Sequence, residues 1–137
     1  MFRRTAVLVI NMLIPLLLGL SIYMTSPSST YLSEQFSKIG IVFPKIYYPD
    51  LISFYACDFC WGYALYSGLE LFNDGTHKVI LPAMLTAAAV EAAQLIPGFP
   101  GTFDVLDILV EMMAVMLAVI ITTFILGGIK HEKQEAY

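Results

Sequence analysis

Four long apolar runs follow one another along the chain, separated by short polar segments. They cover about residues 5–24, 51–72, 79–96 and 103–126. Each run approaches the roughly 20 apolar residues that a helix needs to cross a bilayer. We therefore predict an all-α fold, an integral membrane bundle of four transmembrane helices that forms a single domain over residues 1–137.

The polar segment between the first two runs, residues 25–50, has a pattern of its own. Its apolar side chains recur at helical spacing and share one face: Tyr31, Leu32, Phe36 and Ile39. A short amphipathic helix of this kind lies in the membrane surface with its apolar face toward the lipid. We predict such an interfacial helix here, ending before Gly40.

The basic residues indicate the orientation of the bundle. The face that carries both termini would hold five of them, and the opposite face two: Arg3, Arg4, Lys78, Lys130 and Lys133 against Lys38 and Lys45. Cytoplasmic loops carry an excess of Lys and Arg. We therefore predict an N-in, C-in topology, with the interfacial helix on the extracytoplasmic side.

Composition supports a membrane protein. Of the 137 residues, 58% are hydrophobic and 13% are charged, whereas about a quarter of the residues of a soluble domain are charged. The basic residues are scattered, so we predict no nucleic-acid partner. The expected surroundings are the lipid bilayer.

The acidic residues stand out against this apolar background. The stretch 90–111 holds four carboxylates and a carboxamide but no Lys or Arg. Acids within a membrane helix are expensive and are functional candidates by default. With one acid of the second run, the candidate ligand-binding polar cluster comprises Asp58, Glu91, Gln94, Asp104, Asp107 and Glu111.

Helical geometry predicts how these acids are arranged. Asp104, Asp107 and Glu111 are spaced i, i+3, i+7, so they share one helix face. At about 1.5 Å per residue, Asp58, Glu91 and Glu111 lie roughly 10, 8 and 12 Å from the outer helix ends. Three helices would thus each bring an acid to a similar depth.

Two interpretations of the cluster are open. The acids are either protonated groups whose hydrogen bonds lock the helices together, or an outward-facing pocket for a cation or a polar headgroup; we favour the pocket. One intramembrane charge already costs about 2.5–3.5 kcal/mol on insertion scales. We therefore expect a protonated acid, Glu91 or Glu111, or else a cation or a cationic group among them. Glu70, near the inner end of its helix, is expected to reach the cytoplasmic headgroups.

Cys57 and Cys60 form a CxxC pair, which can be half of a redox or metal site. The two histidines, His77 and His131, are expected at the opposite membrane face. We predict free thiols on a helix, and no metal site or cofactor.

The residues around the acids resemble the VanZ-like family of small bacterial membrane proteins. The resemblance includes Glu91-x-x-Gln94 at a helix end, a Pro/Gly turn, Asp104-x-x-Asp107 at the next helix start, and the segment 58–65. Many members have an arginine in that turn, which this chain lacks, and an asparagine where it has Glu111. The resemblance implies a multi-pass protein of the bacterial cytoplasmic (inner) membrane. Its founding member is associated with low-level resistance to teicoplanin, a glycopeptide antibiotic.

Three classes of function follow, in order of preference. The first is a non-enzymatic envelope protein that binds a lipid-linked cell-wall precursor, an antibiotic or a membrane partner protein at the outer leaflet. The second is a small cation- or proton-linked transporter, or a subunit of a larger membrane complex; a carrier this short would need to oligomerise. The third is an enzyme, which we do not expect because no Ser-His-Asp, Cys-His or HExxH pattern is present, and we predict no catalytic residue.

Overall fold

The computed structural model describes residues 2–28, 30–73, 76–99 and 101–134. This part of the chain is helical and contains no strand, which confirms the all-α prediction. It forms five helices: α1 (Phe2–Thr25), α2 (Tyr31–Lys38), α3 (Asp50–Leu71), α4 (Thr76–Ala93) and α5 (Val105–Gln134).

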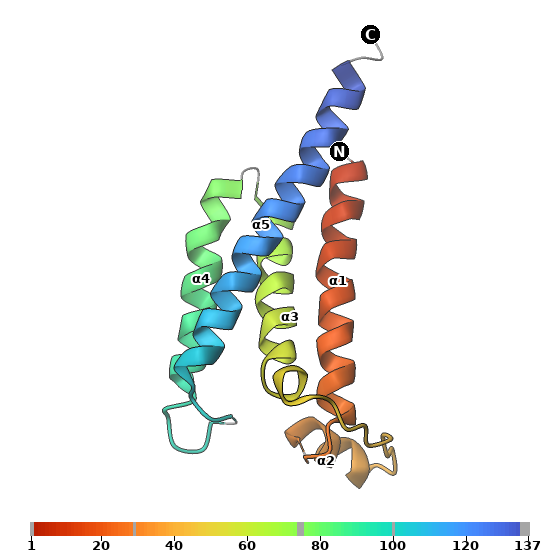
Figure 1. The fold of residues 1–137 in the computed structure, drawn as a ribbon, viewed down its shortest axis with the longest axis vertical. Coiled ribbons are helices and arrows are strands. Elements are labelled where there is room, and N and C mark those ends of the chain that lie inside the picture. The colour runs from red at the N-terminus through yellow and green to blue at the C-terminus, as the bar shows by residue number, and fades with distance from the viewer. Residues whose placement is uncertain (1, 29, 74–75, 100, 135–137) are drawn as a thin grey trace.

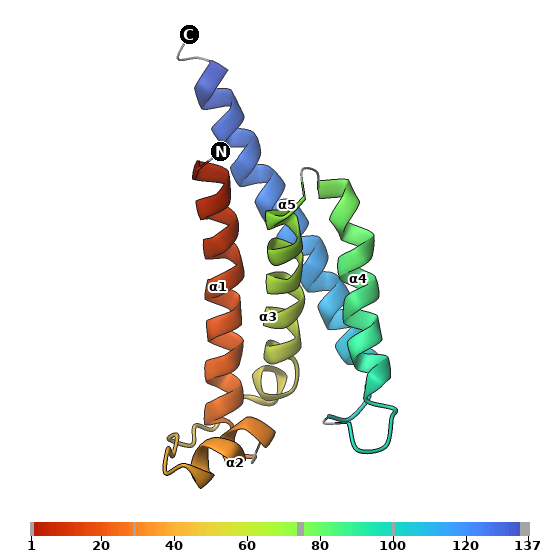
Figure 2. The ribbon, with the colours of Figure 1, turned by 180° about the vertical axis from the view of Figure 1, so that it is seen from behind.

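Four long helices run along the molecule, and α5 crosses the others obliquely (Figure 1). Helix α3 is the centre of the arrangement because it contacts α1, α4 and α5. Seen from behind, it lies between α1 and α4 (Figure 2). A side chain of α3 that points toward α4 and α5 is therefore enclosed by three helices.

Two helices in the described part of the chain are long and apolar enough to cross a membrane. These segments are Arg3–Thr25 in α1 and Val105–Leu126 in α5. Large apolar side chains are exposed on both of them, among them Ile14, Leu17, Ile120 and Phe124. Extensive exposed apolar surface is typical of contact with lipid or with a partner. Helices α3 and α4 do not meet the same criteria of length and hydropathy.

The core fills the space between α3, α4 and α5. Its buried residues combine two tyrosines with small side chains: Tyr63, Tyr66, Val79, Ala83, Ala114, Val115 and Ala118. Small residues at helix interfaces let the backbones approach closely. The alanines of α4 and α5 thus bring these two helices near to α3.

The short helix predicted between the first two runs is present as α2. Its first turn is capped by Thr30, whose Oγ1 accepts a hydrogen bond from the Ser33 amide at 3.3 Å. Phe36 packs edge-to-face against Phe43, with ring centroids 5.7 Å apart. Helix α2 lies across the end of the bundle opposite the termini (Figure 1).

Several helix ends differ from those predicted, and two C-terminal ends show why. Helix α4 ends at Ala93 rather than at 96, because the amides of Gln94, Leu95 and Ile96 bond three residues back and tighten the chain into a turn. Helix α5 continues past residue 126 to Gln134. A glycine costs a helix only about 1 kcal/mol, and no proline follows the Gly-Gly pair to stop it.

Candidate functional site

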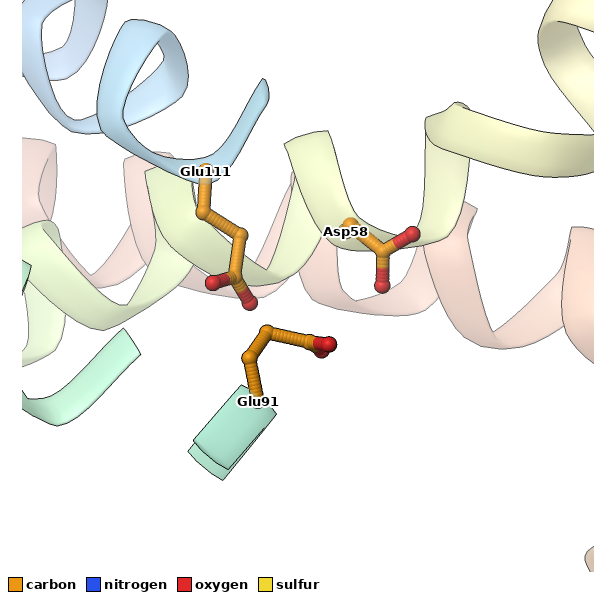
Figure 3. Close-up of side chains that lie close together, drawn as sticks. All are labelled: Asp58, Glu91 and Glu111. Atoms are coloured by element: carbon orange, nitrogen blue, oxygen red, sulfur yellow. The ribbon is translucent and has the colours of Figure 1, made fainter. Parts of the chain in front are cut away.

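Three carboxyl groups from three helices converge in the half of the bundle opposite the termini. They belong to Asp58 of α3, Glu91 of α4 and Glu111 of α5 (Figure 3). One carboxylate oxygen from each lies within 4.8 Å of the others. We call these residues the acid triad. The structure thus brings together the acids that helical geometry had placed at similar depth.

Gly62 positions two members of the triad. It lies one turn after Asp58 and therefore on the same face of α3. A Cβ atom at Gly62 would lie 2.8 Å from the backbone oxygen of Glu111 and 3.0 Å from its Cα. Only glycine therefore lets α5 approach α3 this closely, which places Glu111 beside Asp58.

A second contact orients the third member. Gln94 Nε2 donates a hydrogen bond to Glu91 Oε1 at 2.8 Å. The loop after α4 folds back over Gln94 at Gly101, whose φ of 118° favours glycine. A Cβ at Gly101 would lie 2.6 Å from the Gln94 carboxamide. The loop thus holds Gln94, and Gln94 holds Glu91.

The triad is buried without counter-charge. Glu91 is 2% exposed and Glu111 is 1% exposed, whereas Asp58 is partly exposed. The Oε2 atoms of Glu91 and Glu111 have no hydrogen-bond partner among the described residues. Within that part of the chain, no Lys, Arg or His forms an ion pair with the triad. An unsatisfied buried polar group costs about 1–3 kcal/mol, and a charged one costs more. The site therefore requires a proton or a cation to neutralise its carboxylates.

The remaining predicted residues have different places. Asp107 is partly exposed, one turn before Glu111, and close enough to repel the triad electrostatically. Asp104 is exposed and precedes α5. Its Oδ1 accepts a hydrogen bond from the Leu106 amide at 2.9 Å, so it caps the helix as aspartates commonly do. Asp107 thus borders the triad, whereas Asp104 caps α5 and lies near Glu91 through its backbone and its charge.

Glu70 is a buried acid that the sequence placed wrongly. It is 2% exposed instead of reaching the headgroups. Arg4 reaches it from α1, donating to Glu70 Oε1 at 3.0 Å, to the Glu70 backbone oxygen at 2.9 Å and to the Asn73 backbone oxygen at 2.6 Å. The sequence did contain a signal for this ion pair: Arg4 and Glu70 lie at helix ends that were predicted to share one membrane face.

The two cysteines lie against α1, away from the triad. Both are free thiols. Cys57 Sγ donates to the Gly19 backbone oxygen at 3.5 Å, and a Cβ at Gly19 would lie 2.9 Å from Cys60 Cβ. The CxxC pair therefore supplies small side chains for close packing of α1 on α3.

No family model, no curated protein and no solved structure matches the chain.

Proposed function

We propose that the chain spans the bacterial cytoplasmic membrane four times, with both termini inside. At about 1.5 Å per residue, the 22 residues of α3 and the 18 of α4 measure about 33 and 27 Å. Both lengths are close to the roughly 30 Å of a bilayer's hydrocarbon core. The termini lie at one end of the bundle and α2 at the other (Figure 1), which fits the uneven distribution of basic residues.

Cysteine labelling tests this topology. Single cysteines are introduced at Ser33 and Gln134 in a background that lacks Cys57 and Cys60. A membrane-impermeant maleimide should label position 33 from outside intact cells, and position 134 only after the membrane is opened. Labelling of both positions from the same side would contradict the N-in, C-in arrangement.

We propose that the protein is a non-enzymatic envelope protein whose acid triad binds a positively charged ligand from the outer leaflet. The observation that carries this proposal is the meeting of three carboxyl groups from three helices without a basic partner among the described residues. A cluster with only a structural role would be expected to pair its acids, as Arg4 pairs Glu70. The triad instead leaves two buried oxygens available to a ligand.

The resemblance to VanZ-like proteins narrows the class of ligand. It favours a molecule handled outside the membrane, such as a lipid-linked cell-wall precursor or a glycopeptide antibiotic, which would bind the triad through its amino groups. In the proposed topology, the triad lies in the half of the bundle nearer that side. Asp58 and Asp107 are partly exposed, so they form the side of the cluster from which a ligand enters.

Teicoplanin susceptibility tests the proposed role in cells. A bacterial host that expresses the protein should tolerate more teicoplanin than the host alone. Glu91→Gln combined with Glu111→Gln should abolish this gain at equal membrane abundance, because the isosteric carboxamides remove the charge and keep the shape. Asp50→Asn, an exposed acid at the start of α3, serves as the matched control. Equal protection by the double variant would show that the triad is not the functional site.

A transporter is the second candidate, supported by buried polar atoms in the other half of the bundle. Asn11 Nδ2, Glu70 Oε2 and Thr122 Oγ1 have no hydrogen-bond partner among the described residues. Together with the triad, they place polar groups along much of the length of the bundle. Proton or cation flux into liposomes that contain the purified protein would favour this candidate if Glu111→Gln abolished it. Absence of flux favours the binding protein.

A further inference from the structure

We propose that Asp58, Glu91 and Glu111 bind one hard divalent cation, and that its size is that of Ca²⁺. This inference rests on the proposed function, because it names the positively charged ligand of the same triad. Three separate helices supply one carboxylate oxygen each, and all three oxygens lie within 4.8 Å of one another. An ion among them would join α3, α4 and α5 (Figure 3).

The buried oxygens provide an independent indication of a ligand. Glu91 Oε2 and Glu111 Oε2 are shielded from solvent and have no partner in the described part of the chain. The two glutamates extend toward each other from α4 and α5, with the Asp58 carboxylate beside them (Figure 3). A cation between these groups would satisfy both free oxygens and remove the repulsion among the three carboxylates.

The donor atoms select the class of ion. Carboxylate oxygens suit hard cations such as Ca²⁺, Mg²⁺ and Mn²⁺, whereas thiolates and imidazoles select softer metals. The nearby thiols, Cys57 and Cys60, lie against Gly19 of α1 instead. Three carboxylates carry three negative charges, so a divalent ion leaves one in excess and a monovalent ion leaves two.

Distances and hydration favour Ca²⁺ within that class. Its ligands lie about 2.3–2.6 Å from the ion, so two on opposite sides are about 4.6–5.2 Å apart. Three oxygens spaced evenly around one such ion are about 4.0–4.5 Å apart, and those of the triad lie within 4.8 Å of one another, so small side-chain movements bring all three to the ion. Mg²⁺ holds ligands at about 2.0–2.1 Å, keeps several waters and usually takes only one or two carboxylates. A buried triad suits the larger and more easily dehydrated ion.

The surroundings supply orientation and access. Gln94 holds Glu91 by donating to its Oε1, and this leaves Oε2 for the ion. Residues that orient metal ligands typically change metal affinity about 10–100-fold when they are replaced. Asp58 is partly exposed, so the ion and its remaining waters enter on that side.

Calcium binding to the full-length protein in detergent micelles tests the inference. The protein is stripped with EDTA and then titrated with CaCl₂ by isothermal calorimetry, and thermal unfolding is followed in parallel. We expect one Ca²⁺ per chain and a melting temperature that rises with Ca²⁺ concentration. MgCl₂ at the same concentration should give a smaller rise, and NaCl at matched ionic strength none.

Three variants separate a metal site from a general charge effect. Glu111→Gln should fold without Ca²⁺, melt no lower than the EDTA-treated wild type, and lose the response to Ca²⁺. Gln94→Leu should keep one site per chain and weaken it about 10–100-fold. Asp50→Asn, which removes an exposed acid from α3, should bind Ca²⁺ as the wild type does.

Other outcomes overturn the inference in distinguishable ways. A Ca²⁺ response that persists in Glu111→Gln means that the ion binds elsewhere. A wild type that ignores Ca²⁺, Mg²⁺ and Mn²⁺ but is stabilised by ethanolamine has an amine site, so the metal inference fails while the proposed function stands. A wild type that responds to none of these probes holds protonated acids, and both the inference and the proposed function fail.

Discussion

Both ends of the bundle bury acidic side chains, but only one end neutralises them. Near the termini, Glu70 is held by Arg4 through its carboxylate and its backbone oxygen. At the opposite end, Asp58, Glu91 and Glu111 meet without a basic partner among the described residues. The same chemical group is therefore used in two different ways within one small bundle.

Under the proposed function, this difference separates a structural ion pair from a binding site. An acid paired with arginine is fixed in one geometry, and here it joins α1 to α3 at the end of the bundle that carries the termini. The unpaired triad gives no such joint, because repulsion among its members opposes the packing of α3, α4 and α5. Its members are retained at a cost in stability, which is typical of residues that serve binding.

The largest effect is expected from breaking the paired end. Arg4→Met leaves the Glu70 carboxylate buried without its counter-charge, and such losses cost about 3–5 kcal/mol. Chemical unfolding in detergent should show a loss of this order. The double variant Arg4→Met, Glu70→Met should recover much of it, because replacing both partners avoids the unpaired charge. Lys78→Met, which removes an exposed basic residue from α4, is the control, and an equal loss there would show that the Arg4–Glu70 pair contributes nothing.

The next effect concerns the contact that builds the unpaired end. Gly62→Ala places a Cβ where the Glu111 backbone lies 2.8 Å away, so α5 must move from α3. Overpacking of this kind typically costs about 1–3 kcal/mol. Gly68→Ala is the control on the same helix, since its Cβ would meet only the Met12 side chain at 3.2 Å, which can shift. Equal melting temperatures for the two variants would contradict the role assigned to Gly62.

Two simple features of the sequence predicted much of this arrangement. Apolar runs located the four long helices, and the rise per residue placed Asp58, Glu91 and Glu111 at similar depth. Neither signal shows which way a helix is turned about its axis. The meeting of Glu111 with Asp58 depends on the backbone contact at Gly62, which only the packed structure reveals.

Two other features needed the tertiary structure. The Arg4–Glu70 pair forms because α1 packs against α3, a contact between residues far apart in the chain. Asp104 has helical spacing from Asp107, yet α5 begins at Val105, so Asp104 caps the helix instead of joining the triad. Spacing along the sequence predicts a shared helix face only for residues inside one helix. Sequence patterns locate the ends of a helix less precisely than its middle.

Two substitutions of Glu91 separate the contribution of the unpaired triad to stability from its contribution to ion binding. Glu91→Leu leaves Gln94 Nε2 without its acceptor and removes one ligand of the triad, so we expect a loss of about 1–2 kcal/mol when stability is measured with Ca²⁺ present. Glu91→Gln keeps the size and an oxygen acceptor for Gln94, so it should fold normally while losing Ca²⁺ affinity. If Glu91→Leu is as stable as the wild type, the acids merely line the water interface.

The smallest effect on stability is expected at Asp107, on the exposed side of the triad. Asp107→Asn should change the free energy of unfolding by less than about 0.5 kcal/mol, as surface substitutions usually do. It should nevertheless weaken Ca²⁺ binding at low ionic strength, because the lost charge no longer attracts the cation. Salt screens such a partly exposed charge, and the Debye length falls from about 30 Å at 0.01 M to about 3 Å at 1 M. Calorimetric titrations should therefore separate the variant from the wild type at low salt and bring them together at high salt.

Asp104→Asn is the matched control: asparagine caps a helix as well as aspartate does, and the exposed position should give a smaller change. A defect of Asp107→Asn that is equal at all salt concentrations would make Asp107 a direct ligand, and the triad would then be a site of four acids.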